Sequence, residues 1–255
     1  MPSSHRKQSA DAPAGYFAWE AAGLNWLREA RGAAVVTVLD EAPRHLDLTH
    51  LVSVAATPAD AELFGRGLAT THAAGAPAYG SGPPGWEGDG YLGPLSEPLP
   101  LTLGTWNDWG AFFAQARIRP LVRLARDRGA LSGSEALVLD GLAERVARGA
   151  HDTGEAPARL HGDLWSGNVI WTEHGAVLID PAAHGGHRES DLAMLALFGL
   201  PHLGRVLAAY DEASPLADGW RERVLLHQVH PLLVHAVLFG GSYAGRCVHV
   251  ATHYA

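Results

Sequence analysis

The sequence has a single cysteine, Cys247, among its 255 residues. One cysteine cannot supply an intrachain disulfide framework or an all-cysteine metal site, so the fold must rest on its apolar core. No stretch approaches the roughly 18 consecutive apolar residues of a membrane span, and the N-terminal segment lacks the apolar core of a signal peptide. These absences predict a reducing, cytoplasmic location and no membrane partner.

Positive charge is also scarce. The chain carries 19 Lys and Arg against 27 Asp and Glu, a formal net charge of -8. This balance excludes a basic nucleic-acid binder as the default and predicts no nucleic-acid partner. An acidic chain that handles a phosphate must use backbone donors, a few placed cations or metal ions. Its length allows one sizeable domain or two small lobes.

The 15 histidines raise a metal-binding alternative. His249 and His253 have the i, i+4 spacing that places two imidazoles on one helix face. No acidic or third histidine ligand accompanies them at a familiar spacing, which favours surface or packing roles for most histidines. A zinc-dependent hydrolase built on these residues stays open, and it predicts dependence on Zn²⁺ rather than Mg²⁺.

Apolar spacing predicts the secondary structure. In the first half it indicates helices over 15–30 and 58–73, two neighbouring strands within 33–40 and 44–51, and no other clear strand. The segment 74–104 is dense in Gly and Pro, which is typical of a long loop, and its aromatics indicate that it folds over something. Further helices are expected over 106–129, 132–150, 190–199, 204–213 and 220–243.

The stretch "LHGDLWSGNVIWTEHGAVLIDP" begins at Leu160 and concentrates polar residues around two short apolar runs. "VIW" and "AVLID" are strand-like and "TEHG" is a turn, so the segment predicts a hairpin. Asp163 and Asn168 precede the hairpin, and Asp180 lies where its second strand ends. Folding brings Asp180 alongside Asn168, which creates a pocket of carboxylate and amide oxygens.

Hard oxygen donors of this kind suit Mg²⁺ completed by substrate phosphates. Asp163 precedes Asn168 by five positions, the separation found in the kinase catalytic loop, and Asp180 follows in the place of the metal-binding Asp. In phosphoryl transfer one carboxylate orients the attacking hydroxyl and accepts its proton. Any one of these residues alone could be a turn or cap residue. Their combination favours a phosphotransferase.

The segments "HGDLWSGN", "LIDPAAHGGHRESDLAM" and "LLVHAVLFGGSYAGR" resemble the fructosamine kinase (ketosamine 3-kinase) family, which shares the fold of aminoglycoside phosphotransferases. The resemblance covers nearly the whole chain. It implies an α+β, protein-kinase-like fold of two lobes. Residues 1–52 would form a reduced N-terminal β lobe, and residues 53–255 a mainly helical C-terminal lobe.

The resemblance also implies roles for residues that handle ATP. Asp163 would be the catalytic base, and Asn168 and Asp180 would bind Mg²⁺. Glu20 would pair with the ATP-binding lysine. Three residues would contact adenine through backbone groups: Thr49, His50 and Leu51.

Other implied roles support the catalytic loop and the acceptor. His161 would orient the loop by hydrogen bonding, and Asp191 would brace its backbone. Trp165 would stack against the sugar-like part of the acceptor, or alternatively be a core aromatic beneath the loop.

The sequence departs from the family at its start, too late for the glycine-rich loop that covers the ATP phosphates, which indicates an N-terminal truncation. Only Lys7 stands at about the family's lysine position. Its setting, "SSHRKQS", lacks the apolar alternation of a strand, so Lys7 is either the phosphate-binding lysine or a solvated terminal one. Without the preceding strands the N-lobe sheet would expose an edge.

The predicted function is ATP- and Mg²⁺-dependent phosphorylation of a sugar hydroxyl, the 3-OH, of ketosamines such as fructosamine or ribulosamine, in deglycation. Two alternatives stay open. One is a phosphotransferase for another small hydroxyl acceptor, such as an aminoglycoside or a choline-like alcohol. The other is a non-catalytic pseudokinase. The sequence does not select between a small-molecule and a protein-bound ketosamine, or assign an oligomeric state.

Overall fold

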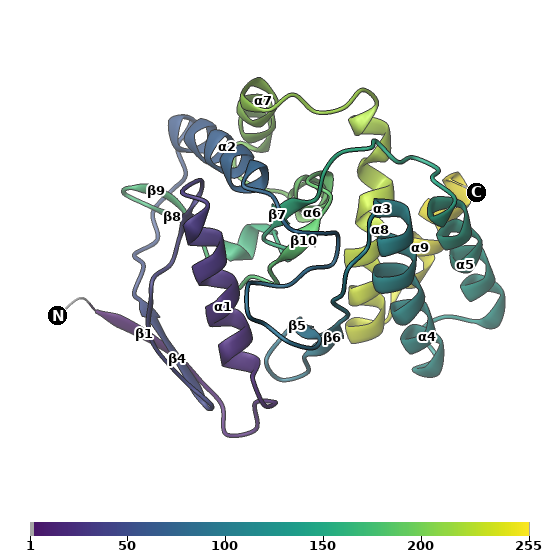
Figure 1. Cartoon of the computed structure of the whole chain (residues 1–255), viewed down its shortest axis with the longest axis horizontal. Helices are drawn as coiled ribbons and strands as arrows, with labels where there is room; N and C mark the ends of the chain where they lie inside the picture. Colours follow the sequence, from purple (N-terminus) through teal and green to yellow (C-terminus); the bar gives the residue numbers. More distant parts are fainter. Residues whose placement is uncertain (1–2, 255) are drawn as a thin grey trace.

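The computed structural model describes residues 3–254. A small antiparallel sheet and the long helix α1 (Tyr16–Glu29) occupy one end of the molecule, and a cluster of helices occupies the other (Figure 1). Short strands lie between the two ends. No helix within this described range is long and apolar enough to cross a membrane.

The N-terminal sheet has the strand order β1 (Ser4–Gln8), β4 (His45–Thr49), β3 (Val38–Ala42), all antiparallel. Helix α1 packs Phe17 and Leu24 against the apolar face of β4, because positions seven apart lie on one side of a helix. The predicted helix over 15–30 and the pairing of the two runs around Pro43 are therefore confirmed.

The expectation that the setting of Lys7 does not form a strand was wrong. Lys7 lies in β1, opposite Leu46 of β4. β1 is an edge strand held by backbone hydrogen bonds, and four of its five side chains are exposed. Such a strand needs no apolar alternation, because it buries no apolar face. Only Lys7 turns inward, toward α1.

The run 33–40 does not form one strand. β2 (Ala34–Val35) pairs in parallel with β9 (Gly175–Leu178), and the chain then crosses into β3. β9 pairs antiparallel with β8 (Val169–Thr172), which confirms the predicted hairpin with its turn at Glu173 and His174. The sheet β2–β9–β8 thus joins the N-terminal part to the hairpin that follows Asn168.

Four further short strands were not predicted. β5 (Gly90–Leu92) and β6 (Leu99–Leu101) form a hairpin within the Gly- and Pro-rich segment, so the expectation of only two strands in the first half was wrong. β7 (Ala158–Leu160) pairs with β10 (His184–Gly186). Strands of three residues are too short to show a readable alternation, and β5, β6 and β10 also contain glycine or proline. β7 and β10 bracket the segment 161–183, which they hold at the centre of the molecule (Figure 1).

The helices follow the predicted pattern, with three differences: the helix expected over 106–129 begins at Trp109 and contains a π-helical segment, α9 (Ser242–His253) was not predicted, and the helix expected over 220–243 is shorter. The helix expected over 220–243 ends at Phe239, since Gly240 and Gly241 both have positive φ and break it. The other elements are α2 (Pro58–Ala73), α3 (Trp109–Phe112), the π-helix η1 (Phe113–Ile118), α4 (Arg119–Asp127), α5 (Gly133–Ala147), the 3₁₀ turn η2 (Ser166–Asn168), α6 (Glu189–Phe198), α7 (Leu203–Ala213), α8 (Trp220–Phe239) and α9 (Ser242–His253).

Candidate active site

At one position, the loop between β7 and η2 adopts a backbone conformation that only glycine permits. Gly162 has φ +82°, and a Cβ there would overlap the carbonyl oxygen of Ala182. His161 then bridges the loop to the hairpin. Its Nε2–H donates to the carbonyl of Ile179 at 2.8 Å, which leaves Nδ1 to accept the N–H of Asp163 at 3.2 Å. His161 therefore holds the backbone of Asp163 in place.

Asp191, near the start of α6, holds the same loop from the other side. Its carboxylate accepts the N–H of His161 at 2.7 Å and that of Gly162 at 3.0 Å, and it lies 3.2 Å from His72 Nε2. The carboxylate is buried. Burial opposes its charge, but His72 and the backbone donors outweigh burial and lower the pKa of Asp191. The loop is thus anchored to an ionised group in the core.

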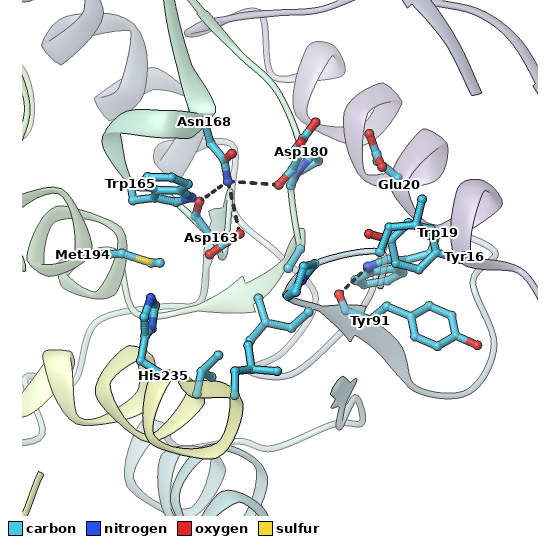
Figure 2. A pocket seen from close by; sticks show the side chains of 18 of the residues that line it. Tyr16, Trp19, Glu20, Tyr91, Asp163, Trp165, Asn168, Asp180, Met194 and His235 are labelled. Carbon is cyan, nitrogen blue, oxygen red and sulfur yellow. Dashed lines mark hydrogen bonds between the residues drawn. The ribbon is translucent and has the colours of Figure 1, made fainter. Parts of the chain in front are cut away.

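Asn168 brings together the two carboxyl-bearing residues of the site (Figure 2). Its Nδ2 donates to the backbone oxygen of Asp163 at 2.8 Å, to Asp163 Oδ2 at 3.1 Å and to the backbone oxygen of Asp180 at 3.4 Å. Asp180 has φ +53°, a left-handed conformation that Asp tolerates, and its side chain is 41% exposed. The hairpin therefore places Asp180 beside Asn168, as the sequence predicted.

The Asp163 carboxyl has an altered proton affinity. Burial raises its pKa to about 7, the hydrogen bond from Asn168 opposes this, and the charges of Asp180 and Asp191 add to it. A carboxyl with a pKa near neutrality is suited to accepting a proton during a reaction.

Lys7 is the single lysine of the sequence. Its Nζ contacts both carboxylate oxygens of Glu20, at 2.8 and 2.6 Å, and Asp180 Oδ1 at 3.1 Å. The side chain is only 19% exposed, so Lys7 is not a solvated terminal residue. Burial alone would lower its pKa, but Glu20 and Asp180 raise it above the ordinary value. A permanent cation on β1 thus lies between Glu20 of α1 and Asp180, which follows the hairpin.

A cavity of about 430 Å³ opens in front of these residues. Figure 2 shows Asp163 and Asn168 at its centre, Glu20, Tyr16 and Trp19 on one side, and Trp165, Met194 and His235 on the other. The end of β5 and the turn after it contribute Leu92 to Leu95, so the Gly- and Pro-rich segment covers a cavity, as its aromatics indicated. Apolar and aromatic side chains form the wall away from Lys7.

Trp165 lies on this wall and is 40% exposed, which is not the burial of a core aromatic beneath the loop. Its ring covers Gly167, where a Cβ would overlap the indole, and its edge packs against Phe198. The glycine two residues later therefore lets the ring lie flat along the loop and face the cavity.

His235 and Met194 line the cavity without having been predicted as site residues. His235 Nδ1–H donates to the carbonyl of Pro231 at 2.8 Å, which leaves Nε2 as an acceptor, and burial lowers the pKa of the imidazole. The available signal was one histidine inside the apolar run "LLVHAVLF" of α8. Such a position faces either the core or a cavity, and only packing distinguishes them.

Thr49, His50 and Leu51 do not line this cavity. The N–H of Thr49 donates to the carbonyl of Thr37, and that of His50 to the carbonyl of Ser3, both at 2.9 Å. The N–H groups of two of the three residues expected at the adenine are thus already hydrogen-bonded within the chain. Contact of this segment with adenine stays a prediction.

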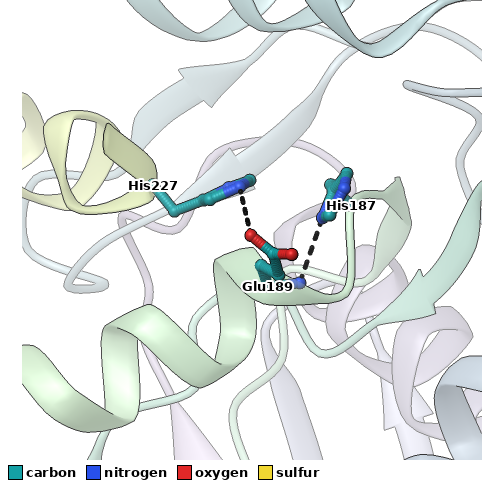
Figure 3. A group of neighbouring side chains, drawn as sticks. All are labelled: His187, Glu189 and His227. Carbon is teal, nitrogen blue, oxygen red and sulfur yellow. Dashed lines mark hydrogen bonds and ion pairs between the residues drawn. The ribbon is translucent and has the colours of Figure 1, made fainter. Parts of the chain in front are cut away.

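A second cluster of titratable groups lies between α6 and α8, where His187, Glu189 and His227 are close enough to share a metal ion (Figure 3). Arg223 already binds the Glu189 carboxylate through two nitrogens, at 2.9 and 2.5 Å. Since a divalent cation would add a second positive charge to the same carboxylate, the cluster is better explained as a brace between the helices. His249 and His253 are exposed on α9 and belong to neither candidate metal group of the described residues.

Comparisons with known proteins extend this description. A model of the fructosamine kinase family matches residues 6–254. A curated "Probable ketoamine kinase" from Enterococcus faecium is 34% identical over 180 residues, which are 70% of this chain and 61% of the relative. The chain therefore spans about three fifths of that relative's length.

Solved structures give a similar result. A "putative fructosamine-3-kinase" from Thermobifida fusca is 47% identical with a TM-score of 0.91, over 99% of this chain and 85% of that one. A thermostable mutant of the aminoglycoside phosphotransferase APH(4)-Ia is 16% identical with a TM-score of 0.58, over 99% of this chain and 87% of that one, and shows the shared fold alone. The predicted α+β, kinase-like fold is thereby confirmed.

Proposed function

This chain belongs to the fructosamine kinase family, and from that premise we propose that it transfers the terminal phosphoryl group of ATP to a sugar hydroxyl, the 3-OH, of a ketosamine such as fructosamine or ribulosamine. The observation that carries the proposal is one cavity that joins Lys7, Asp163, Asn168 and Asp180 to a wall bearing Trp165. One side of this cavity suits phosphates, and the other suits a sugar.

Asp163 is the group placed to act on the acceptor. His161 and Asn168 hold it at the cavity, and its pKa of about 7 keeps a substantial fraction ionised at neutral pH. It would orient the attacking hydroxyl and accept its proton as the phosphoryl group moves in line. Phosphorylation of the 3-OH would make the sugar adduct labile, which is the proposed role in deglycation.

Asn168 and Asp180 would hold the divalent cation, for which we propose Mg²⁺. The amide nitrogen of Asn168 donates to three oxygens, whereas its amide oxygen accepts no hydrogen bond within residues 3–254 and is free to bind a cation. Asp180 presents a half-exposed carboxylate beside it. One amide and one carboxylate oxygen fit a cation that keeps waters and binds phosphate oxygens. When bound, the cation would neutralise charge on the phosphates.

Lys7 would bind the ATP phosphates from the opposite side, held by Glu20. We expect Lys7→Met to lower kcat/KM for ATP by about 10²-fold, because it removes a fixed positive donor from the phosphates. We expect Lys7→Arg to recover little, since a planar guanidinium does not fit the space of an ammonium. Steady-state kinetics with ATP varied measure both effects.

The single lysine provides an independent control. An amine-reactive label can modify only Lys7 and the N-terminal amine of this chain. Peptide mapping should show that ATP with Mg²⁺ slows modification of Lys7 and leaves that of the terminal amine unchanged. Equal labelling of Lys7 with and without nucleotide would contradict its role.

Trp165 would stack against the sugar, with His235 Nε2 available to accept a hydroxyl hydrogen bond across the cavity. We expect Trp165→Ala to raise KM for the ketosamine about 10-fold, because an aromatic stacking surface is lost, while KM for ATP changes little. Trp165→Phe should restore most of the affinity. An equal rise in both KM values would instead indicate a distorted loop.

An acceptor panel tests the proposed function itself. ATP consumption is measured with fructosyl-lysine, ribulosyl-lysine, an aminoglycoside and choline at equal concentrations with Mg²⁺, and NMR of the product identifies the phosphorylated hydroxyl. Turnover with the two ketosamines alone supports the proposal. Turnover with the aminoglycoside or choline would replace the substrate class, and no turnover with any acceptor would favour a pseudokinase.

A further inference from the structure

Aromatic rings form a continuous row along the wall of the active-site cavity that lies away from Lys7. The ring centres of Trp165 and of Phe198, on α6, are 6.1 Å apart, and that of Phe198 lies 4.8 Å from the ring centre of His235, on α8. The rings of His235 and Phe239 are 5.4 Å apart. All four side chains line the cavity, at spacings typical of aromatic pairs in contact. This aromatic row runs from the loop between β7 and η2 to the end of α8.

Phe239 is the outer end of the aromatic row. Its side chain is 62% exposed although it also lines the cavity. The helix ends directly after it, because Gly240 and Gly241 both have positive φ. A single exposed phenylalanine is ordinary by itself, but this one continues a wall that is already aromatic. An apolar group bound along the row would cover the ring of Phe239 and remove it from water.

Charge in the cavity is confined to its centre and to the side of Lys7 (Figure 2). The described residues line the cavity with four charged side chains: Lys7, Glu20, Asp163 and Asp180. Three of them form one ion-paired group, and Asp163 is hydrogen-bonded to Asn168. His235 is neutral near pH 7, because burial lowers the pKa of its imidazole. An anion against the aromatic row would lose hydration without gaining an ionic partner, whereas an apolar group would gain buried area.

The turn after β5 forms the facing wall, and it is fixed to the same helix. A Cβ on Gly93 would lie 3.3 Å from Leu238 Cδ1, so the turn touches α8. Arg128 binds the carboxylate of Glu97, further along the turn, and donates to the carbonyl of Val237 at 3.3 Å. The two walls are therefore held together before any ligand binds, which reduces the ordering cost of binding.

The chemistry of the acceptor determines which part of it faces the aromatic row. In a ketosamine the amine nitrogen is bonded to C1 of the sugar, close to the carbon that bears the 3-OH. When that hydroxyl lies at Asp163 and the phosphates lie beside Lys7, the sugar occupies the space next to Trp165. The substituent on the nitrogen then has the rest of the row, from Phe198 to Phe239, as its nearest surface.

We propose that the aromatic row is the subsite for the substituent on the ketosamine nitrogen, and that Phe239 makes it select aryl and longer alkyl substituents. The inference rests on the proposed function, since it places the 3-OH at Asp163. Ketosamines formed from apolar amines, above all from arylalkyl amines, are then the preferred acceptors. A methyl substituent is too short to reach Phe239 and gains nothing from it.

Isothermal titration calorimetry with the fructose adducts of methylamine and of benzylamine, in the presence of Mg²⁺ and a non-hydrolysable ATP analogue, tests the subsite. We expect the benzylamine adduct to bind about 10-fold more tightly, because its ring is buried against aromatic side chains. Phe239→Ala should remove most of this difference by weakening the benzylamine adduct alone, and Phe239→Tyr should retain it. Leu137→Ala is the matched control, because it truncates an exposed apolar side chain of α5 outside the cavity, and it should change neither affinity.

Turnover of the same two adducts with ATP separates this inference from the proposed function. Equal affinity for both adducts, a difference that persists in Phe239→Ala, or binding of neither adduct would overturn the subsite. Phosphorylation of both adducts at equal affinity would overturn the subsite and leave the kinase assignment intact. A difference in affinity that Phe239→Ala abolishes supports the subsite even when neither adduct is phosphorylated, in which case the proposed reaction alone fails.

Discussion

Asp163→Asn is expected to lower turnover with a ketosamine acceptor about 10³-fold while leaving ATP affinity largely unchanged. The amide cannot accept the hydroxyl proton, and a positioned general base contributes ~10²–10⁴-fold. The substitution keeps the shape of the side chain, and its oxygen can still accept the hydrogen bond from Asn168 Nδ2. Lost turnover would therefore reflect lost chemistry rather than lost structure.

Single-turnover phosphate transfer and a nucleotide-binding titration measure the two parts of this prediction. Asp140→Asn is the matched control, because it makes the same chemical change at an exposed position of α5. Its turnover should equal that of the unmodified chain. Unchanged turnover in Asp163→Asn would remove Asp163 from the reaction, whereas a loss confined to ATP affinity would assign it to nucleotide binding.

Acid is expected to destabilise this protein already between pH 8 and pH 5, above the range in which ordinary Asp and Glu carboxylates titrate. Four histidines have lowered pKa values, with desolvation as the main cause: the buried His161, His184 and His187, and the partly buried His230. Each must gain a proton on unfolding once the pH falls below about 6.5, the value in the unfolded chain. Their contribution is present in full above pH 6.5 and decreases from there toward the folded pKa.

The size of the effect can be estimated for His184, whose folded pKa is about 3. Because the folded chain keeps His184 neutral, the free energy of unfolding falls by about 2 kcal/mol between pH 8 and pH 5. Each pH unit below the unfolded pKa corresponds to ~1.4 kcal/mol. The other three histidines act in the same direction. Asp163 acts in the opposite direction, because burial raises its folded pKa to about 7 and the folded chain therefore binds this proton more tightly than the unfolded chain does. Glu189, with a pKa of about 2, responds only at lower pH.

Urea unfolding at pH 8, 7, 6 and 5 measures this dependence. His184→Gln should flatten the curve by about 2 kcal/mol between pH 8 and pH 5, because it removes one titrating group. His249→Gln, at an exposed position of α9, should leave the curve unchanged. A curve for His184→Gln with the same slope from pH 8 to pH 5 as that of the unmodified chain would show that burial does not lower the pKa of His184.

Local patterns in the sequence were sufficient to predict most helices and the residues at the centre of the site. The helices α1, α2 and α5 follow from apolar spacing, and α2 and α5 begin at the N-cap residues Thr57 and Ser132, whose side chains accept a backbone hydrogen bond. Asp163, Asn168 and Asp180 were predicted to meet because a hairpin is a local structure with one geometry. These contacts join residues that are close in the chain, so a short stretch of sequence is enough to predict them.

The remaining features depend on contacts between distant segments. Lys7 reaches Glu20 and Asp180 because β1 pairs with β4, and an exposed edge strand has no apolar alternation to recognise. β7 and β10 are three-residue strands whose pairing joins segments 24 residues apart. Backbone hydrogen bonding of this kind is nearly independent of side-chain type, so composition cannot reveal it.

By itself, the sequence determined the loop that carries Asp163, the hairpin and most of the helices, because periodicity and spacing act over short distances. Only the tertiary structure decided that Lys7 is an inward-facing ion-pair partner, that His235 lines the cavity, and that Arg117 lies buried without a carboxylate. Burial and charge compensation are properties of what packs around a side chain, and those neighbours come from everywhere in the chain.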